Sequence, residues 1–138
     1  MEDYKVVNVG PLSAWGDLGD SRKGKLFIDS DLGSEFIGTS VNSTPPGGQS
    51  PFWHTHNVVE EIYIFLSGGG EIALDDDVLP VEAGTIIRVP KGVWRALHCP
   101  ESASEPLTWL CLRAGGDALQ TIGKDGELDS ERPFPWNV

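Results

Sequence analysis

The chain has 138 residues, enough for one compact domain and too few for two ordinary ones. Hydrophobic residues make up 39% and charged residues 22%, the balance of a soluble globular protein, and 17 glycines with 10 prolines favour short strands over long helices. The formal net charge of −11 argues against nucleic acid or a membrane surface as partner, because both repel an acidic chain without a basic patch.

The compartment and the state of the cysteines are predicted together. Residues 1–5 are polar and acidic and lack the basic and apolar regions of a secretory signal. The longest apolar run, 62–66, is far shorter than the roughly 20 residues that cross a bilayer. We therefore expect a cytoplasmic protein in which Cys99 and Cys111 stay reduced and lie in the core.

The pattern along the chain predicts an all-β fold. Residues 1–35 are polar and loop-like, and we expect them to form an N-terminal arm. Between residues 36 and 114, the predicted barrel core, short runs rich in β-branched and aromatic residues alternate with turn signals, as in a sandwich or barrel. The expected strands are 36–41, 52–56, 61–66, 71–74, 78–81, 85–89, 93–99 and 107–113. Residues 115–138 form a predicted C-terminal tail.

The segment 48–61 carries the candidate chemistry. Because side chains alternate along a strand, His54 and His56 point to the same side. Glu61 opens the next expected strand and can close the site if that strand pairs beside the first. Two nitrogen ligands and one oxygen ligand suit Fe(II), Mn(II), Zn(II), Ni(II) or Cu(II), with open positions for water or substrate. Two exposed histidines beside an acidic loop are the alternative, which the apolar neighbouring strands disfavour.

This segment resembles the first motif of the cupin family. The matching positions are Gly48, five residues, His54-Thr55-His56, four residues, Glu61, six residues and Gly68. Downstream, Gly84, five residues and Pro90-Lys91-Gly92 match the opening of the second motif. The resemblance covers about residues 36–114 and implies a double-stranded β-helix, a small jelly-roll barrel with the site inside.

The resemblance also implies which residues hold the metal. In the family, the two histidines and the glutamate of the first motif are metal ligands, and this role carries over to His54, His56 and Glu61. Glu60 is the competing carboxylate, because the family allows three or four intervening residues. The six-residue spacing to Gly68 favours Glu61.

Arg95 is a departure from the family pattern, because it stands where the second motif usually supplies a histidine ligand. Arginine stays protonated and cannot ligate a metal. His98 lies three residues further on, so in a regular strand it faces away from Arg95, and only a bulge would bring it inward. Two consequences stay open. Either Arg95 points into the barrel and grips a carboxylate or phosphate, or it pairs with Glu61 or Glu60 and the metal site is degenerate.

Aromatic residues give predictions about the pocket and the surface. Tyr63 and Phe65 share the face of Glu61, so we expect them to line the pocket. Trp53 and Trp94 are expected on the opposite face of their strands from the site. Outward aromatics on a small barrel need cover from the arm, the tail or a second subunit, so a homodimer is a reasonable expectation.

The reaction itself cannot be chosen from the resemblance, since cupins include dioxygenases, decarboxylases, isomerases, storage proteins and sensing domains. The first hypothesis is a mononuclear metal-dependent enzyme acting on a small anionic substrate. Arg95 would orient the anion, and Tyr63 is a candidate proton donor. The alternative is a non-catalytic metal- or ligand-binding cupin module, and a structural protein with a vestigial site is the third possibility.

Overall fold

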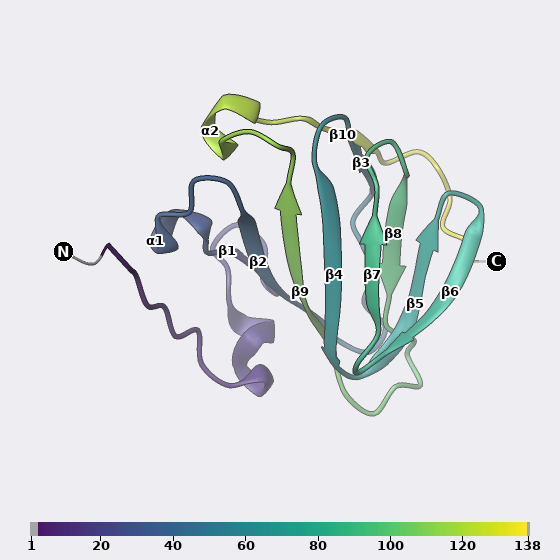
Figure 1. Cartoon of the computed structure of the whole chain (residues 1–138). Coiled ribbons are helices and arrows are strands. Elements are labelled where there is room, and N and C mark those ends of the chain that lie inside the picture. The colour runs from purple at the N-terminus through teal and green to yellow at the C-terminus, as the bar shows by residue number, and fades with distance from the viewer. Residues whose placement is uncertain (1–2, 138) are drawn as a thin grey trace.

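The computed structural model describes residues 3–137 and shows two antiparallel five-stranded sheets that together form a barrel (Figure 1). The first sheet has the order β1-β2-β9-β4-β7, with bounds Lys25–Phe27, Gly38–Thr44, Leu107–Ala114, Glu60–Ser67 and Ile86–Val89. The second sheet has the order β10-β3-β8-β5-β6, with bounds Gly126–Asp129, Trp53–His56, Arg95–His98, Gly69–Leu74 and Asp77–Glu82. This architecture confirms the predicted all-β jelly-roll class.

Helices play a small part in the described residues. They are the 3-10 helix η1 (Leu12–Asp17) and the α-helices α1 (Asp29–Leu32) and α2 (Leu119–Ile122). Within residues 3–137, no helix has both the length and the apolar character that crossing a membrane requires.

The predicted strands are present, with one informative difference in β2. The sequence analysis ended this strand at residue 41, because the residues that follow are polar and turn-like. In the structure β2 continues to Thr44 and pairs with β9 along its whole length, from Gly38 opposite Arg113 to Thr44 opposite Leu107. The buried Asn42 side chain has partners inside the barrel, since its Nδ2 donates to the backbone oxygen and the hydroxyl of Ser40. Local hydrogen bonding and long-range pairing therefore override the turn preference.

The segments predicted as arm and tail are built into the two sheets as edge strands. From the N-terminal segment, β1 pairs with β2, and from the C-terminal segment, β10 pairs with β3 (Figure 1). The sheets therefore extend from residue 25 to residue 129, beyond the predicted barrel core of 36–114. The addition of β10 makes β3 an interior strand, which protects it from pairing with other chains.

The C-terminal tail covers the outward aromatic residues of the second sheet. Trp53 is 1% exposed. The Phe134 ring stacks on it with ring centres 6.0 Å apart, and the Arg132 guanidinium lies 4.0 Å from the centre of the Trp53 ring. Trp136 stacks on Phe134 at 5.3 Å, and Trp94 packs against the same cluster. Of the three covers considered from the sequence, the tail is the one present on Trp53. A homodimer stays a prediction that this contact neither needs nor tests.

Candidate metal site

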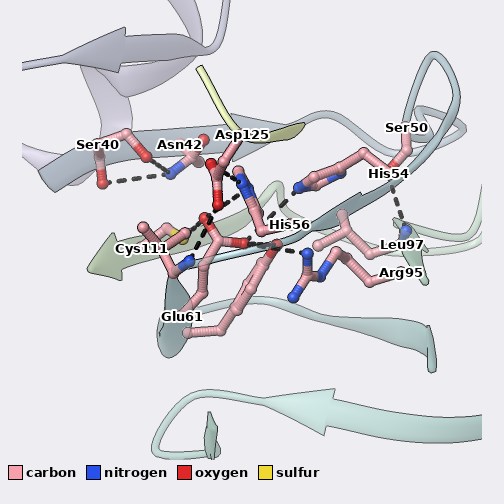
Figure 2. Close-up of polar contacts among 12 residues, drawn as sticks. Ser40, Asn42, Ser50, His54, His56, Glu61, Arg95, Leu97, Cys111 and Asp125 are labelled. Atoms are coloured by element: carbon pink, nitrogen blue, oxygen red, sulfur yellow. Dashed lines mark hydrogen bonds and ion pairs between the residues drawn. The ribbon is translucent and has the colours of Figure 1, made fainter. Parts of the chain in front are cut away.

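The three predicted ligands converge inside the barrel. Nε2 of His54 lies 3.7 Å from Oε1 of Glu61, and Nε2 of His56 lies 3.5 Å from Oε2 of the same carboxylate (Figure 2). One ligand atom from each residue lies within 4.8 Å of the other two. The two imidazole rings meet edge to face, with ring centres 5.3 Å apart. This is the nitrogen, nitrogen and oxygen donor set expected from the sequence.

Glu61 reaches the histidines by a route other than the one considered from the sequence. Pairing of the two strands side by side was the condition given there for Glu61 to close the site, and this pairing is not present. β3 pairs with β10 and β8 in the second sheet, whereas β4 pairs with β9 and β7 in the first. The short connection over residues 57–59 crosses from one sheet to the other, and Glu61 reaches the histidines across the barrel interior. The three donors therefore meet only when the two sheets close on each other.

Glu60 is excluded as the ligand by the alternation of side chains along β4. Its side chain is 56% exposed and lies 3.8 Å from Arg88 on the outer surface. Glu61, the next residue, points inward and is buried. The choice of Glu61 over Glu60 agrees with the motif spacing.

The charge states of the site suit a divalent cation. Burial alone would raise the pKa of Glu61, but contacts with His54 and His56 and the Arg95 charge outweigh it and hold the pKa well below its usual range. Burial lowers the pKa of His54, against the opposing pull of Glu61. At neutral pH the site therefore offers an ionised carboxylate and, at His54, a neutral imidazole with a free lone pair.

Asp125 is a site residue that the sequence analysis did not identify. Its Oδ1 lies 2.8 Å from Nδ1 of His56, and its Oδ2 accepts hydrogen bonds from the amides of Val58 and Val59. Since a carboxylate can only accept, Nδ1 of His56 carries a proton, and Nε2 is the ring nitrogen that faces Glu61. Burial alone would lower the pKa of His56, but Glu61 and Asp125 outweigh it and raise the pKa. Asp125 thereby fixes the ring orientation that metal binding needs.

Arg95 points into the barrel and lies beside Glu61. Its side chain is 1% exposed, and its Nη1 lies 3.8 Å from Oε1 of Glu61, too far for a hydrogen bond. Nε, Nη1 and Nη2 are all buried without a hydrogen-bond partner among residues 3–137. The inward guanidinium of the first alternative and the Glu61 ion pair of the second are both present, and the N–H groups of Arg95 still have no acceptor within residues 3–137. Buried donors of this kind are costly unless something accepts from them.

His98 lies on the outer face of β8 and cannot supply a fourth ligand. Its Nε2 lies 2.9 Å from Oε1 of Glu71, and its ring stacks on Trp136 with ring centres 4.3 Å apart. The strand has no bulge there, because Arg95 and His98 keep regular pairing with β5. The odd separation between Arg95 and His98 therefore gives opposite faces, as predicted.

Two protonated side chains hold the Glu61 carboxylate from the barrel core. The Tyr63 hydroxyl donates to Oε1 at 3.2 Å, and the Cys111 thiol donates to Oε2 at 3.3 Å. Burial raises the pKa of both groups, and the negative charge of Glu61 raises each further. Both therefore stay protonated at neutral pH. Cys99 is likewise a buried free thiol, as predicted for the two cysteines.

The site opens into a cavity of about 510 Å³ between the sheets. This volume is in the usual range for small-molecule sites. Its lining includes the three candidate ligands together with Arg95 and Tyr63. The donor set fits a divalent transition metal, since two imidazole nitrogens and one carboxylate oxygen leave coordination positions facing the cavity.

Comparison with known proteins gives the family. A family model described as Cupin domain matches residues 41–113, just over half of the chain, so the chain belongs to the cupin family. No curated protein matches it.

Solved structures share the fold. A cupin protein from Bacteroides fragilis is 25% identical with a TM-score of 0.70, over 84% of this chain and 87% of that chain. A Klebsiella pneumoniae protein with a double-stranded β-helix domain is 17% identical with a TM-score of 0.67, over 90% of this chain and 98% of that chain. A protein from Acidithiobacillus ferrooxidans, provisionally described as a sugar phosphate isomerase, is 22% identical with a TM-score of 0.57. That match covers 65% of this chain and 57% of the other, and it carries the fold alone.

Proposed function

We propose that this protein is a mononuclear metal-dependent enzyme that acts on a small anionic molecule. The observation that carries the proposal is the convergence of His54, His56 and Glu61 in a cavity beside the buried, unpartnered guanidinium of Arg95. These three residues would hold a divalent Fe, Mn, Zn, Ni or Cu ion. Such an ion supplies Lewis acidity, which polarises a bound oxygen atom.

Arg95 would bind and orient the anionic group of the substrate. A guanidinium presents its N–H donors as a planar fork that matches a carboxylate or a phosphate. The donors of Arg95 are buried, face the cavity and have no acceptor within residues 3–137. An incoming anion would accept hydrogen bonds from these donors and neutralise the charge of the guanidinium.

Tyr63 is the candidate proton donor. Its hydroxyl lies in the cavity wall and donates to Glu61. Because its pKa is raised, the hydroxyl keeps its proton at neutral pH, so it would act by donating a hydrogen bond to a charged substrate oxygen, and it would give up the proton only to a strongly basic oxygen. This role fits a reaction of the decarboxylase, isomerase or dioxygenase type, in which charge develops on a substrate oxygen.

A non-catalytic metal- or ligand-binding module is the second candidate. Tyr63 and Cys111 both donate hydrogen bonds to Glu61, so the position of each side chain is explained without a role in catalysis. This observation favours the binding module. The two candidates share the metal site and differ in turnover.

Metal analysis of protein purified without chelators tests the proposal. We expect about one transition-metal ion per chain, as for a single site with this donor set, and its loss in the double variant His54→Ala/His56→Ala. His98→Ala is the matched control, because His98 lies on the outer face of the barrel and should leave metal content unchanged. Metal content that survives the double substitution would refute the ligand assignment.

Turnover separates the two candidates. The metal-loaded protein would be incubated with small carboxylates and phosphates, and products followed by mass spectrometry. Product formation that is lost in Tyr63→Phe and Arg95→Gln supports the enzyme. Anion binding without any product supports the binding module.

A further inference from the structure

The cavity wall opposite Arg95 carries a second basic side chain, Lys25. Lys25 lies on β1 in the first sheet, whereas Arg95 lies on β8 in the second, and both line the cavity. The Lys25 ammonium donates to Oδ1 of Asn42, its cross-strand partner, at 3.0 Å, which directs it inward. In Figure 2, Asn42 and Arg95 lie on either side of the Glu61 carboxylate.

The Lys25 ammonium has no carboxylate within ion-pair distance among residues 3–137. None of the ion pairs among residues 3–137 involves Lys25 or Arg22, its basic neighbour in the cavity wall. Arg113 also lines the cavity but pairs with Asp29 at 3.4 Å. Burial lowers the pKa of Lys25, and the charge of Glu61, which raises it, offsets this effect only in part.

Basic residues are gathered at this cavity out of proportion to the chain. Among residues 3–137, five lysines and arginines line it, against two acidic residues, Glu61 and Asp125. Both of these acids are engaged with histidines. In a chain with a net charge of −11, such a concentration of cations favours a ligand with more than one negative charge.

We propose that the molecule bound in this cavity carries an anionic group at each end, one held by Arg95 and the other by Lys25 with Arg22. This inference rests on the proposed function, since it takes the ligand of that site and defines its class. Facing sheets lie about 10 Å apart, a gap that a short molecule can bridge when long basic side chains reach in from both walls. Short dicarboxylates and phosphorylated carboxylates share the required chemistry.

Calorimetric titration of the zinc-loaded protein tests this inference with matched probes. Succinate and butyrate have the same chain length and differ in the second carboxylate, and 2-phosphoglycolate offers a phosphate at one end. We expect wild-type protein to bind one or both dianions at least about tenfold more tightly than butyrate, as one charge-assisted hydrogen bond would give. Preference between succinate and 2-phosphoglycolate then tells which anionic group the second position takes.

Substitutions at position 25 locate the second anion. Lys25→Met should remove the preference for the dianion and leave butyrate binding and zinc stoichiometry unchanged, whereas Lys25→Arg should keep the preference. Lys91→Met, in the exposed turn between β7 and β8, is the matched control and should behave as wild type. Circular dichroism checks that each variant is folded.

The outcomes separate this inference from the proposed function. If zinc and butyrate bind but wild type shows no preference for a dianion, or Lys25→Met keeps it, the two-anion assignment is overturned and the proposed function stands. If the folded wild-type protein retains no metal, the proposed function fails first, and the inference that rests on it falls too.

Discussion

Nδ1 of His56 lies 2.8 Å from Oδ1 of Asp125, although the two residues are 69 positions apart in the sequence. The carboxylate is itself fixed by the amides of Val58 and Val59, in the connection between β3 and β4. Asp125 thus ties one candidate ligand to the segment that carries the chain from the histidine strand toward Glu61. The orientation of His56 depends on a residue outside the family motif.

Replacing Asp125 by alanine should weaken metal binding by about 10- to 100-fold, the usual effect of removing the carboxylate partner of a ligating histidine. The cause is the loss of the hydrogen bond that orients the ring and selects the tautomer. Competition with a chromogenic chelator measures the affinity. Glu127→Ala, at an exposed position of β10, is the control and should change nothing. Equal affinities for Asp125→Ala and wild type would show that the ring needs no such support.

Much of the site was predictable from local pattern. Strand alternation is a property of the backbone alone, so it placed His54 and His56 together and His98 on the opposite face from Arg95. Motif spacing chose Glu61 over Glu60. The placement of the three histidines needed only the geometry of single strands, whereas the choice of Glu61 rested on the resemblance to the cupin motif.

The rest depended on how distant segments pack, which no local pattern encodes. The sheet partner of β4 could not be predicted, because the sequence does not say whether a three-residue connection turns within a sheet or crosses between sheets. Asp125 and Lys25 were missed because they come from segments that read as loops, and only the pairing of β10 and β1 brings them to the cavity. A turn signal at Lys124–Gly126 gave no reason to associate Asp125 with a histidine.

A histidine at position 95 should strengthen metal retention. Positions 54 and 95 are direct partners where β3 meets β8, so an imidazole there faces the cavity beside His54. We expect Arg95→His to slow metal release to a chelator on the order of tenfold. An added metal ligand should strengthen binding at least as much as a hydrogen-bond partner of an existing ligand does. Arg88→His, on the exposed face of β7, is the control. Unchanged release would mean that position 95 does not reach the ion.

The two thiols should be unreactive in the folded protein. Cys99 and Cys111 are buried, and burial raises the pKa of each, so little thiolate is present at neutral pH. A disulfide-exchange reagent should titrate both thiols in guanidinium chloride and react at least about tenfold more slowly with native protein. Rapid reaction of either thiol in the native state would contradict the burial described here.

The aromatic cover on Trp53 should contribute measurably to stability. Phe134→Ala removes the ring stacked on Trp53, and because Phe134 is only partly buried we expect a loss of about 1–3 kcal/mol in the free energy of unfolding. Urea denaturation followed by tryptophan fluorescence measures it. Glu131→Ala, exposed in the same tail, is the control. A loss no greater than that of the control would show that the tail rests on the sheet without stabilising it.

The position of β10 in the chain has a consequence for biosynthesis. β3 and the rest of the barrel leave the ribosome before residues 125–129, so the histidine strand has one open edge and an unsupported His56 ring while synthesis continues. A nascent chain at that stage would expose backbone groups to its neighbours and coordinate ions poorly. The hydrogen bond that orients His56 would therefore form only after this strand docks.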